Sequence, residues 1–286
     1  MRGLALAVTL LFSPALLLAS EQADLYVIPV AGHLTGTGGS NWASDIAIQN
    51  FQSTPLTVQL IVIESGEGMP DNVSALDSQV GSSVTVPANG TRILRDALNG
   101  HRGLPQTIGA VIVGADRPFA ISSRSYSIAA SGATESESVM PVRDFIDNSL
   151  GDTNLAVATA YVPGLTANSR YRTNLGFVAG SGSPSGLTLE VTLRGADGAL
   201  LGTRMFTIPG AAFEHVQFSS TSMTNQTFDA ASATYRIVSG DGAVIPYASV
   251  VDNLSAAGFY ISGQFPANAP FTKSSVFRSL FKRITR

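Results

Sequence analysis

The chain has 286 residues, of which 44% are hydrophobic and only 13% are charged, and it contains no cysteine. A chain without cysteine can form neither a disulfide nor a cysteine-based zinc site. All 20 acidic residues lie between Glu21 and Asp252, whereas five of the 17 basic residues lie in the last 14 positions. An acidic body with a basic end argues against nucleic acid as the partner.

Residues 1–20 have the three parts of a secretory signal peptide. Arg2 provides the positive start, an apolar run extends from Leu4 to Leu18, and small residues follow it. A membrane anchor is the alternative, but the run is shorter than the ~20 residues that span a bilayer. We therefore expect cleavage near Ser20 and a mature protein that is secreted or periplasmic.

The rest of the sequence contains two copies of one pattern. Residues 41–48 align with 170–177, and each piece reads aromatic, any residue, hydroxyl, Asp or Asn, then alternating apolar residues. Further matches keep the same order, and they pair 56–60 with 187–191, 86–88 with 208–210, and 112–119 with 237–244. Several matches in register indicate an internal repeat.

Within each copy the pattern is typical of β-strands. Apolar and polar residues alternate over 187–194, and an Asp-Gly turn precedes a second run over 201–208, which predicts a hairpin. A further hairpin is predicted in each copy, from 109–113 with 118–123 and from 233–239 with 243–251. Six to eight short strands per copy predict an all-β fold of two tandem immunoglobulin-like β-sandwiches.

The repeat also sets the expected domain boundaries. The first copy has about nine extra residues within 64–80, which predicts a longer hairpin loop that is either a binding loop or a tolerated insertion. The expected segments are a signal peptide at 1–20, a first sandwich at 24–130, a packed connector at 131–159, a second sandwich at 160–262 and a basic tail at 271–286.

Two sets of residues resemble a repeat found in large secreted proteins of soil bacteria. The first is the aromatic-x-hydroxyl-Asp/Asn string at 42–46 and 171–177. The second is a strand ending that reads Ser-Ser-Arg-Ser-Tyr at 122–126 and Ala-Ser-Val-Val-Asp-Asn at 248–253. The resemblance covers about residues 26–255 and implies an immunoglobulin-like sandwich and export. The family has no agreed biochemical role, so no catalytic residues are implied.

The sequence contains no recognisable active site, and we predict no metal and no cofactor. The three histidines, His33, His101 and His215, are not at metal-ligand spacing from one another. Glu135 and Glu137 lie on one face of an extended chain, but the segment is polar and rich in serine, so we expect a solvated loop without a raised pKa. A hydrolase is a remote alternative that requires His33 or His215 to meet carboxylates in a pocket.

Four residues at the repeated aromatic motif are candidates for ligand binding, namely Trp42, Asp45, Tyr171 and Asn174. An exposed aromatic ring can stack on a sugar ring while the neighbouring Asp or Asn oxygen accepts a hydrogen bond from a hydroxyl. Because these residues recur at equivalent positions, the alternative is a structural role in packing, with the Asp or Asn holding a turn.

The tail at 271–286 predicts a short amphipathic helix, because apolar residues from Val276 to Ile284 recur at helical spacing. Such a helix can contact an anionic membrane or an acidic partner, or it can dock on the acidic body of its own chain. The basic residues that would make these contacts are Lys273, Arg278, Lys282 and Arg283.

These features favour a non-catalytic exported protein with a structural, adhesive or protein-interaction role in the cell envelope or extracellular space. A carbohydrate-binding module is the alternative, and exposure of Trp42 and Tyr171 on one surface would favour it. The partner is expected to be a protein or a glycan.

Overall fold

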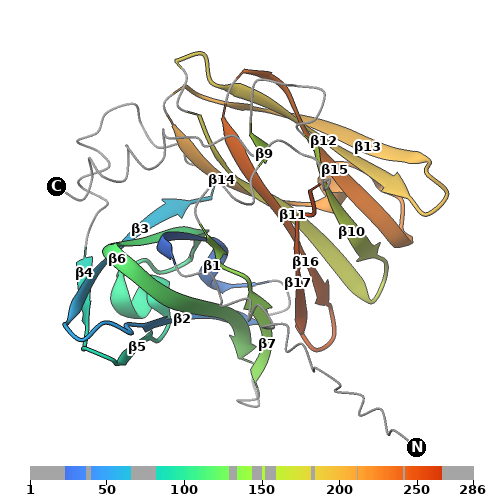
Figure 1. The fold of residues 1–286 in the computed structure, drawn as a ribbon. Coiled ribbons are helices and arrows are strands. Elements are labelled where there is room, and N and C mark those ends of the chain that lie inside the picture. Colours follow the sequence, from blue (N-terminus) through green and yellow to red (C-terminus); the bar gives the residue numbers. More distant parts are fainter. Residues whose placement is uncertain are drawn as a thin grey trace, which may run out of the picture.

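The computed structural model of the chain is almost entirely antiparallel β-sheet, as the sequence predicts. It describes residues 23–36, 40–65, 82–128, 134–143, 150–151, 159–181, 184–210, 212–240 and 242–265. The strands form two groups, which we call the first half (23–143) and the second half (150–265) (Figure 1). The expected signal peptide, the loop within 64–80 beyond Ser65, and the expected tail helix lie outside the described residues.

The first half contains two sheets. Sheet A has the strand order β4-β3-β6-β1, with β8 paired to β1, and sheet B has the order β5-β2-β6-β7. A π-helical turn, Ala97–His101, follows β5. The strands are β1 Ala23–Thr35, β2 Asn41–Gln49, β3 Leu56–Glu64, β4 Ser82–Val86, β5 Thr91–Leu94, β6 Thr107–Ile128, β7 Thr134–Val139 and β8 Val142–Arg143.

The expected connector at 131–159 contributes to these sheets. Within it, β7 pairs with the later part of β6, from Ser123 with Val139 to Ile128 with Thr134. The two residues of β8 pair with Tyr26 and Val27 of β1. The first half of the structure therefore extends past residue 130.

The second half also contains two sheets. Sheet C has the order β14-β11-β16-β17, with β9 paired to β16, and sheet D has the order β10-β15-β12-β13. The hairpin predicted from residues 187–208 is confirmed, because Leu187 pairs with Ile208 and Leu193 with Gly202. The strands are β9 Leu150–Gly151, β10 Thr159–Ala167, β11 Tyr171–Gly180, β12 Leu187–Gly195, β13 Leu200–Ile208, β14 Phe213–Ser219, β15 Phe228–Gly240, β16 Ala243–Asp252 and β17 Gly258–Ser262, with a 3-10 turn at Ser220–Ser222.

The second predicted hairpin of each copy is wrong. In the first half, β6 runs without a turn for 22 residues, pairing first with β1 and β3 and then with β2 and β7. In the second half, the chain breaks between β15 and β16, but these strands enter sheets D and C instead of pairing with each other. The break has a local cause, because Gly240 has a φ of 83° and a Cβ there would collide with the carbonyl of Gly186.

The aligned sequence segments occupy corresponding strands of the two halves. Segments 41–48 and 170–177 form most of β2 and β11, and 56–60 and 187–191 lie in β3 and β12. The first part of β6 corresponds to β15, and its later part corresponds to β16. With this correspondence, sheet A has the same strand order as sheet D, and sheet B has the same strand order as sheet C.

Each half buries a core between its two sheets. Alternate residues of every central strand point inward, so the period of two in the sequence becomes one apolar face per sheet. In the first half this core includes Ile28, Ile46, Leu60 and Phe119. In the second half it includes Leu175, Phe177, Leu189, Val191 and Tyr235.

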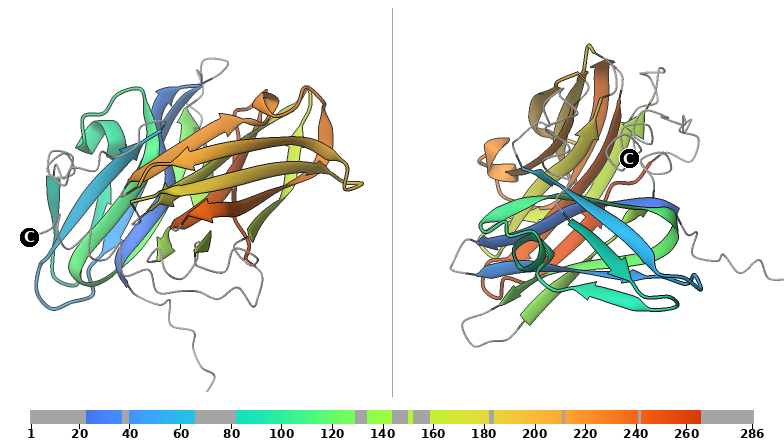
Figure 2. Two further views of the ribbon diagram at one scale, coloured as in Figure 1. Left: turned by 90° about the horizontal axis from the view of Figure 1, so that it is seen from above. Right: turned by 90° about the vertical axis from the view of Figure 1, so that its left-hand side faces the viewer.

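A third apolar cluster joins the outer face of sheet A to the outer face of sheet C. Val27, Ile61 and Ile112 come from sheet A, and Val178 and Ile245 come from sheet C. The two halves therefore pack face to face, as the turned views show (Figure 2). Within the described residues, no helix is long and apolar enough to cross a membrane.

Candidate ligand-binding site between the two halves

A cavity of about 300 Å³ lies between the two halves. The second half contributes the outer face of sheet C, through Arg172, Asn174, Gln217 and Ser249. This face changes character along β11, from polar at Arg172 and Asn174 to apolar at Val178, which packs against sheet A. The cavity is thus the place where polar side chains of sheet C join the apolar contact, and Val30, Leu34, Ile108 and Val251 also line it.

The first half closes the cavity with residues from β1, β2, β6 and β7, of which β1 contributes Val30, Gly32 and Leu34. Trp42 and Ser44 come from β2, Ser125 from β6 and Glu137 from β7. The Ser44 hydroxyl accepts a hydrogen bond from the Gly32 amide at 2.8 Å and lies 2.8 Å from the Ser125 hydroxyl. This wall of the cavity is therefore rich in hydrogen-bonding groups that are already held in place.

Glu137 is the main correction to the sequence analysis. The expected solvated loop is strand β7, and Glu137 is only 8% exposed, whereas Glu135 is exposed. The Ser249 hydroxyl donates a hydrogen bond to the carboxylate at 3.2 Å. Burial raises the pKa of Glu137 to about 7, and the single hydroxyl lowers it only in part. Sheet C covers this face of β7, which a local reading of a serine-rich segment does not reveal.

Trp42 is held in the cavity wall between two glycines. Its indole Nε1 donates to the hydroxyl of Ser40 at 3.1 Å. A Cβ on Gly36 would lie 2.9 Å from Trp42 Nε1, and a Cβ on Gly258 would lie 3.2 Å from Trp42 Cη2. The same Gly258 Cβ would lie 2.7 Å from Glu137 Oε2, so the indole and the carboxylate border one small residue.

A buried aromatic stack lies behind the cavity, on the outer face of sheet C. The Tyr247 ring stacks on His215 on one side and on Tyr260 on the other, with ring centroids 5.9 Å and 5.8 Å apart. The Tyr247 hydroxyl lies 2.7 Å from His215 Nε2 and donates to Gln217 Oε1 at 3.0 Å. Since Gln217 lines the cavity, this network orients one of its polar groups.

Burial perturbs the titration of this stack. It lowers the pKa of His215 to about 3, because the imidazole is fully buried, and it raises the pKa of Tyr247 and of Tyr260. Nearby ionised groups, including Glu137, add to the rise for both tyrosines. His215 is therefore neutral at physiological pH and serves as a hydrogen-bonding sheet residue.

The structure separates the four ligand-binding candidates. Trp42 and Asn174 line the cavity. Tyr171 packs against the core of the second half, and Arg170 lies over its ring. Trp42 and Tyr171 therefore do not share one exposed surface.

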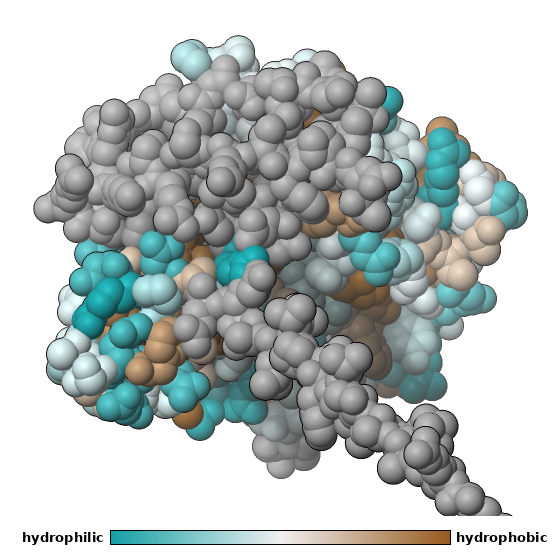
Figure 3. Space-filling view, in the orientation of Figure 1, coloured by the Kyte–Doolittle hydropathy of each residue, from teal (hydrophilic) through white to brown (hydrophobic). Residues whose placement is uncertain are grey.

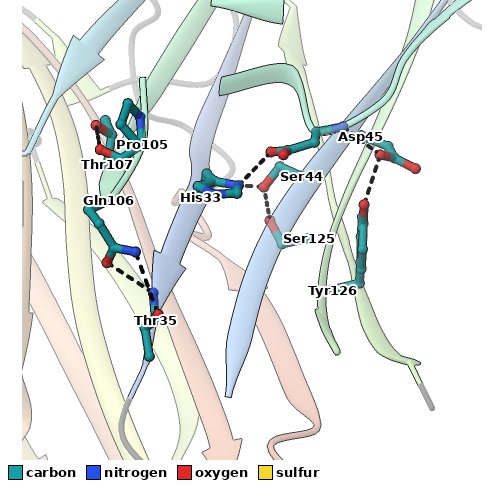
Figure 4. A network of polar contacts seen from close by, with 11 residues as sticks. His33, Thr35, Ser44, Asp45, Pro105, Gln106, Thr107, Ser125 and Tyr126 are labelled. Carbon is teal, nitrogen blue, oxygen red and sulfur yellow. Dashed lines mark hydrogen bonds and ion pairs between the residues drawn. The ribbon is translucent and has the colours of Figure 1, made fainter. Parts of the chain in front are cut away.

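Asp45 is committed to a structural network on the other side of β2. Its carboxylate accepts hydrogen bonds from Arg95 Nη1 at 2.6 Å, from Arg124 Nη2 at 2.8 Å and from the Asp96 amide at 3.0 Å. Although burial raises the pKa of Asp45, these bonds together lower it. Figure 4 shows Asp45 and Tyr126 on one side of β2 and Ser44 and Ser125 on the other.

One histidine does meet a carboxylate, but outside the cavity. His33 Nδ1 lies 2.9 Å from Asp96 Oδ1, and Asp96 has a left-handed backbone with φ 46°. Neither residue lines the cavity. Among the described residues, no group of three or more histidine or carboxylate side chains could hold a metal ion.

The sequence analysis did not identify Glu137, Gln217 and Ser249 as site residues. A signal for Glu137 exists in retrospect, because Glu135, Glu137 and the apolar Val139 alternate with serines at a period of two. Gln217 shares a strand face with His215, but only the packing of the two halves brings it to a cavity. In the space-filling view, hydrophobic side chains lie in a hollow to the right of centre (Figure 3).

No protein-family model and no curated protein matches the chain. Among solved structures, it is similar to a lectin from Pleurotus ostreatus in complex with GalNAc, at 10% identity, with 88% of each chain covered and a TM-score of 0.22. It is also similar to the structure of the infectious bursal disease virus Gt strain, at 9% identity, with 86% of this chain and 73% of that chain covered and a TM-score of 0.23. These TM-scores are too low to support a shared fold or function.

Proposed function

We propose that this chain is a non-catalytic, exported binding protein of the cell envelope or extracellular space, and that the cavity between its halves binds a saccharide. The observation that carries the proposal is the composition of the cavity. It combines one indole, Trp42, with carboxylate, amide, guanidinium and hydroxyl groups from both halves.

This composition suits a sugar. A sugar ring offers an apolar face that packs on an aromatic side chain, and its hydroxyls need several donors and acceptors in fixed positions. Asn174 and Gln217 can each donate and accept at once, and the serines can do the same. The volume of about 300 Å³ lies at the lower end of the range for small-ligand sites, which is typical of a site for one sugar ring.

The proposal includes two tandem immunoglobulin-like sandwiches that arose by duplication. The shared strand order of sheets A and D, and of sheets B and C, supports it. The aligned segments at equivalent strands support it as well. The resemblance to the exported bacterial repeat agrees with the proposed location, and the basic tail adds a proposed contact with anionic membrane.

The absence of catalysis is part of the proposal for a chemical reason. Glycoside hydrolysis generally needs two carboxyl groups on either side of the scissile bond. Among the described residues that line the cavity, Glu137 is the one carboxylate. The His33–Asp96 pair does not line the cavity, and the Ser44 hydroxyl is already bonded to Gly32 and near Ser125.

Intrinsic fluorescence provides a direct test, because Trp42 is the only tryptophan of the chain. Titration with monosaccharides should shift or quench its emission with saturation, and calorimetry should give the same dissociation constant. Trp42→Ala should remove the calorimetric binding. Tyr161→Ala, at an exposed aromatic residue outside the cavity, is the matched control and should leave binding unchanged. Emission that stays constant across a panel of sugars contradicts the proposal.

A further inference from the structure

Glu137 is a buried acid that has no cationic partner among the residues that the structure describes. Its carboxylate accepts hydrogen bonds from the Ser249 hydroxyl, at 3.2 and 3.4 Å, and forms no ion pair within the described part of the chain. Burying a carboxylate without a counter-charge is costly, so proteins usually pair such groups. Here the unpaired group faces a cavity, where a ligand can supply the missing charge.

The surroundings of Glu137 suit an ammonium group in particular. Trp42 and Glu137 both line the cavity, and an edge atom of the indole and Glu137 Oε2 border the same Gly258, so a cation at this end of the cavity lies near a carboxylate and an aromatic ring. A cation over an indole is attracted by the ring quadrupole, most strongly where water is excluded. A charge-assisted hydrogen bond to the carboxylate adds to this attraction.

We infer that the ligand is an amino sugar whose free, protonated amine lies between the Glu137 carboxylate and the Trp42 ring. This inference rests on the proposed function and specifies the class of saccharide. The Ser249 hydroxyl then remains as a second donor to Glu137, while the sugar hydroxyls face the amide side chains of Asn174 and Gln217.

The other titratable groups around the cavity are compatible with this orientation. Arg172 also lines the cavity, but its Nη1 donates to Asn253 Oδ1 at 2.8 Å, and this hydrogen bond is exposed to solvent. The amine therefore binds away from Arg172, at the Glu137 end. Tyr247 and Tyr260 feel the charge of Glu137, and both stay neutral because burial raises their pKa.

Binding of a cation should also be linked to the protonation of Glu137. In the free protein, burial raises the pKa of this carboxyl to about 7, so a large part of it is neutral at neutral pH. An adjacent ammonium favours the ionised form, so binding releases a proton. Calorimetry in buffers of different ionisation enthalpy measures this release directly.

The test compares glucosamine, N-acetylglucosamine and glucose, because these sugars differ only at position 2 and only the first carries a charged amine. At pH 7 we expect glucosamine to bind about ten-fold more tightly than the other two. In Glu137→Gln, which keeps the shape but not the charge, this preference should disappear while weak binding of all three sugars remains. Glu135→Gln removes an exposed carboxylate of the same strand outside the cavity, and this matched control should retain the preference.

The outcomes separate this inference from the proposed function. Equal binding of the three sugars by the wild-type protein overturns the amine and leaves the saccharide site in place. A preference for glucosamine that survives Glu137→Gln also overturns the role of Glu137. If none of a wider sugar panel binds, both proposals fail. Should Glu137→Gln fold poorly, proton release on glucosamine binding by the wild-type protein still decides the matter, and its absence overturns the role of Glu137.

Discussion

At the level of single residues, Glu137 ties the stability of the fold to pH. The unfolded chain ionises this group near its ordinary pKa of 4.5, whereas the folded chain does so at about 7. The folded state therefore binds more protons between these values, and the free energy of unfolding falls as pH rises from about 4.5 to about 7. The shift corresponds to about 3 kcal/mol. Urea unfolding at pH 5 and pH 8 should show this loss, and Glu137→Gln should remove it.

His215 has the opposite effect on the pH dependence of the free energy of unfolding. Its pKa is lowered to about 3, so between pH 6.5 and about 3 the unfolded state binds the proton and the folded state does not. The free energy of unfolding should thus fall as pH decreases through this window, by up to about 5 kcal/mol. His215→Phe should flatten the acid limb of the stability curve, because phenylalanine keeps the stack on Tyr247 but cannot be protonated. At neutral pH the variant should lose about 1 kcal/mol with the lost hydrogen bond to Tyr247. An unchanged acid limb contradicts this assignment.

The two residues also show what a sequence can and cannot predict at this scale. The position of His215 on a strand is visible in the sequence, because Phe213, His215 and Gln217 recur at a period of two. The environment of Glu137 depends on Ser249, which is 112 residues away along the chain. No local sequence pattern indicates that these two residues are in contact. Trp42 was identified as a binding candidate, but its equivalent in the second half, Tyr171, packs against a core instead.

At the level of elements, the strands themselves were predicted better than their pairing partners and the path of the chain between the sheets. The hairpin of β12 and β13 follows from alternation and a turn, which are local features. Whether a strand such as β6 bends between sheets or stops, as β15 does, depends on a few residues. Gly240 and Gly242 interrupt the second copy, while Asp116 and Arg117 stand in the matched region of the first. The periodicity of both copies is the same, so periodicity alone could not distinguish these paths.

The contact of β11 with β16 allows a specific prediction about Gly176. The ring of Tyr247 covers this glycine so closely that a Cβ would collide with it. Gly176→Ala should therefore displace Tyr247 and lower the free energy of unfolding by about 2 kcal/mol, as overpacking usually does. Combined with Tyr247→Leu, which removes the colliding atoms, the cost should be smaller than the sum of the two single changes. Additive costs in this double-mutant cycle contradict the contact.

At the level of the whole molecule, the apolar contact between sheets A and C decides whether the halves unfold together. Ile245 is 2% exposed in this contact, with Val178 and Ile61 in the same cluster. Ile245→Asp places a charge there and should split a single calorimetric transition into two, or lower its midpoint by several degrees. Thr203→Asp, on the exposed face of sheet D, is the matched control and should have little effect. If the two variants unfold with the same number of transitions and the same midpoints, the halves are thermally independent.

The cavity has an implication for the history of the protein, given the proposed duplication. Its two walls are not equivalent surfaces, since one is formed by β1, β2, β6 and β7 and the other by the outer face of sheet C. A single-copy ancestor had only one half, so it could not form a cavity between two halves. The proposed ligand binding at this place would therefore be younger than the duplication, and selection could act on Trp42 and on Asn174 independently. Relatives with one copy should retain the motif and lack the binding.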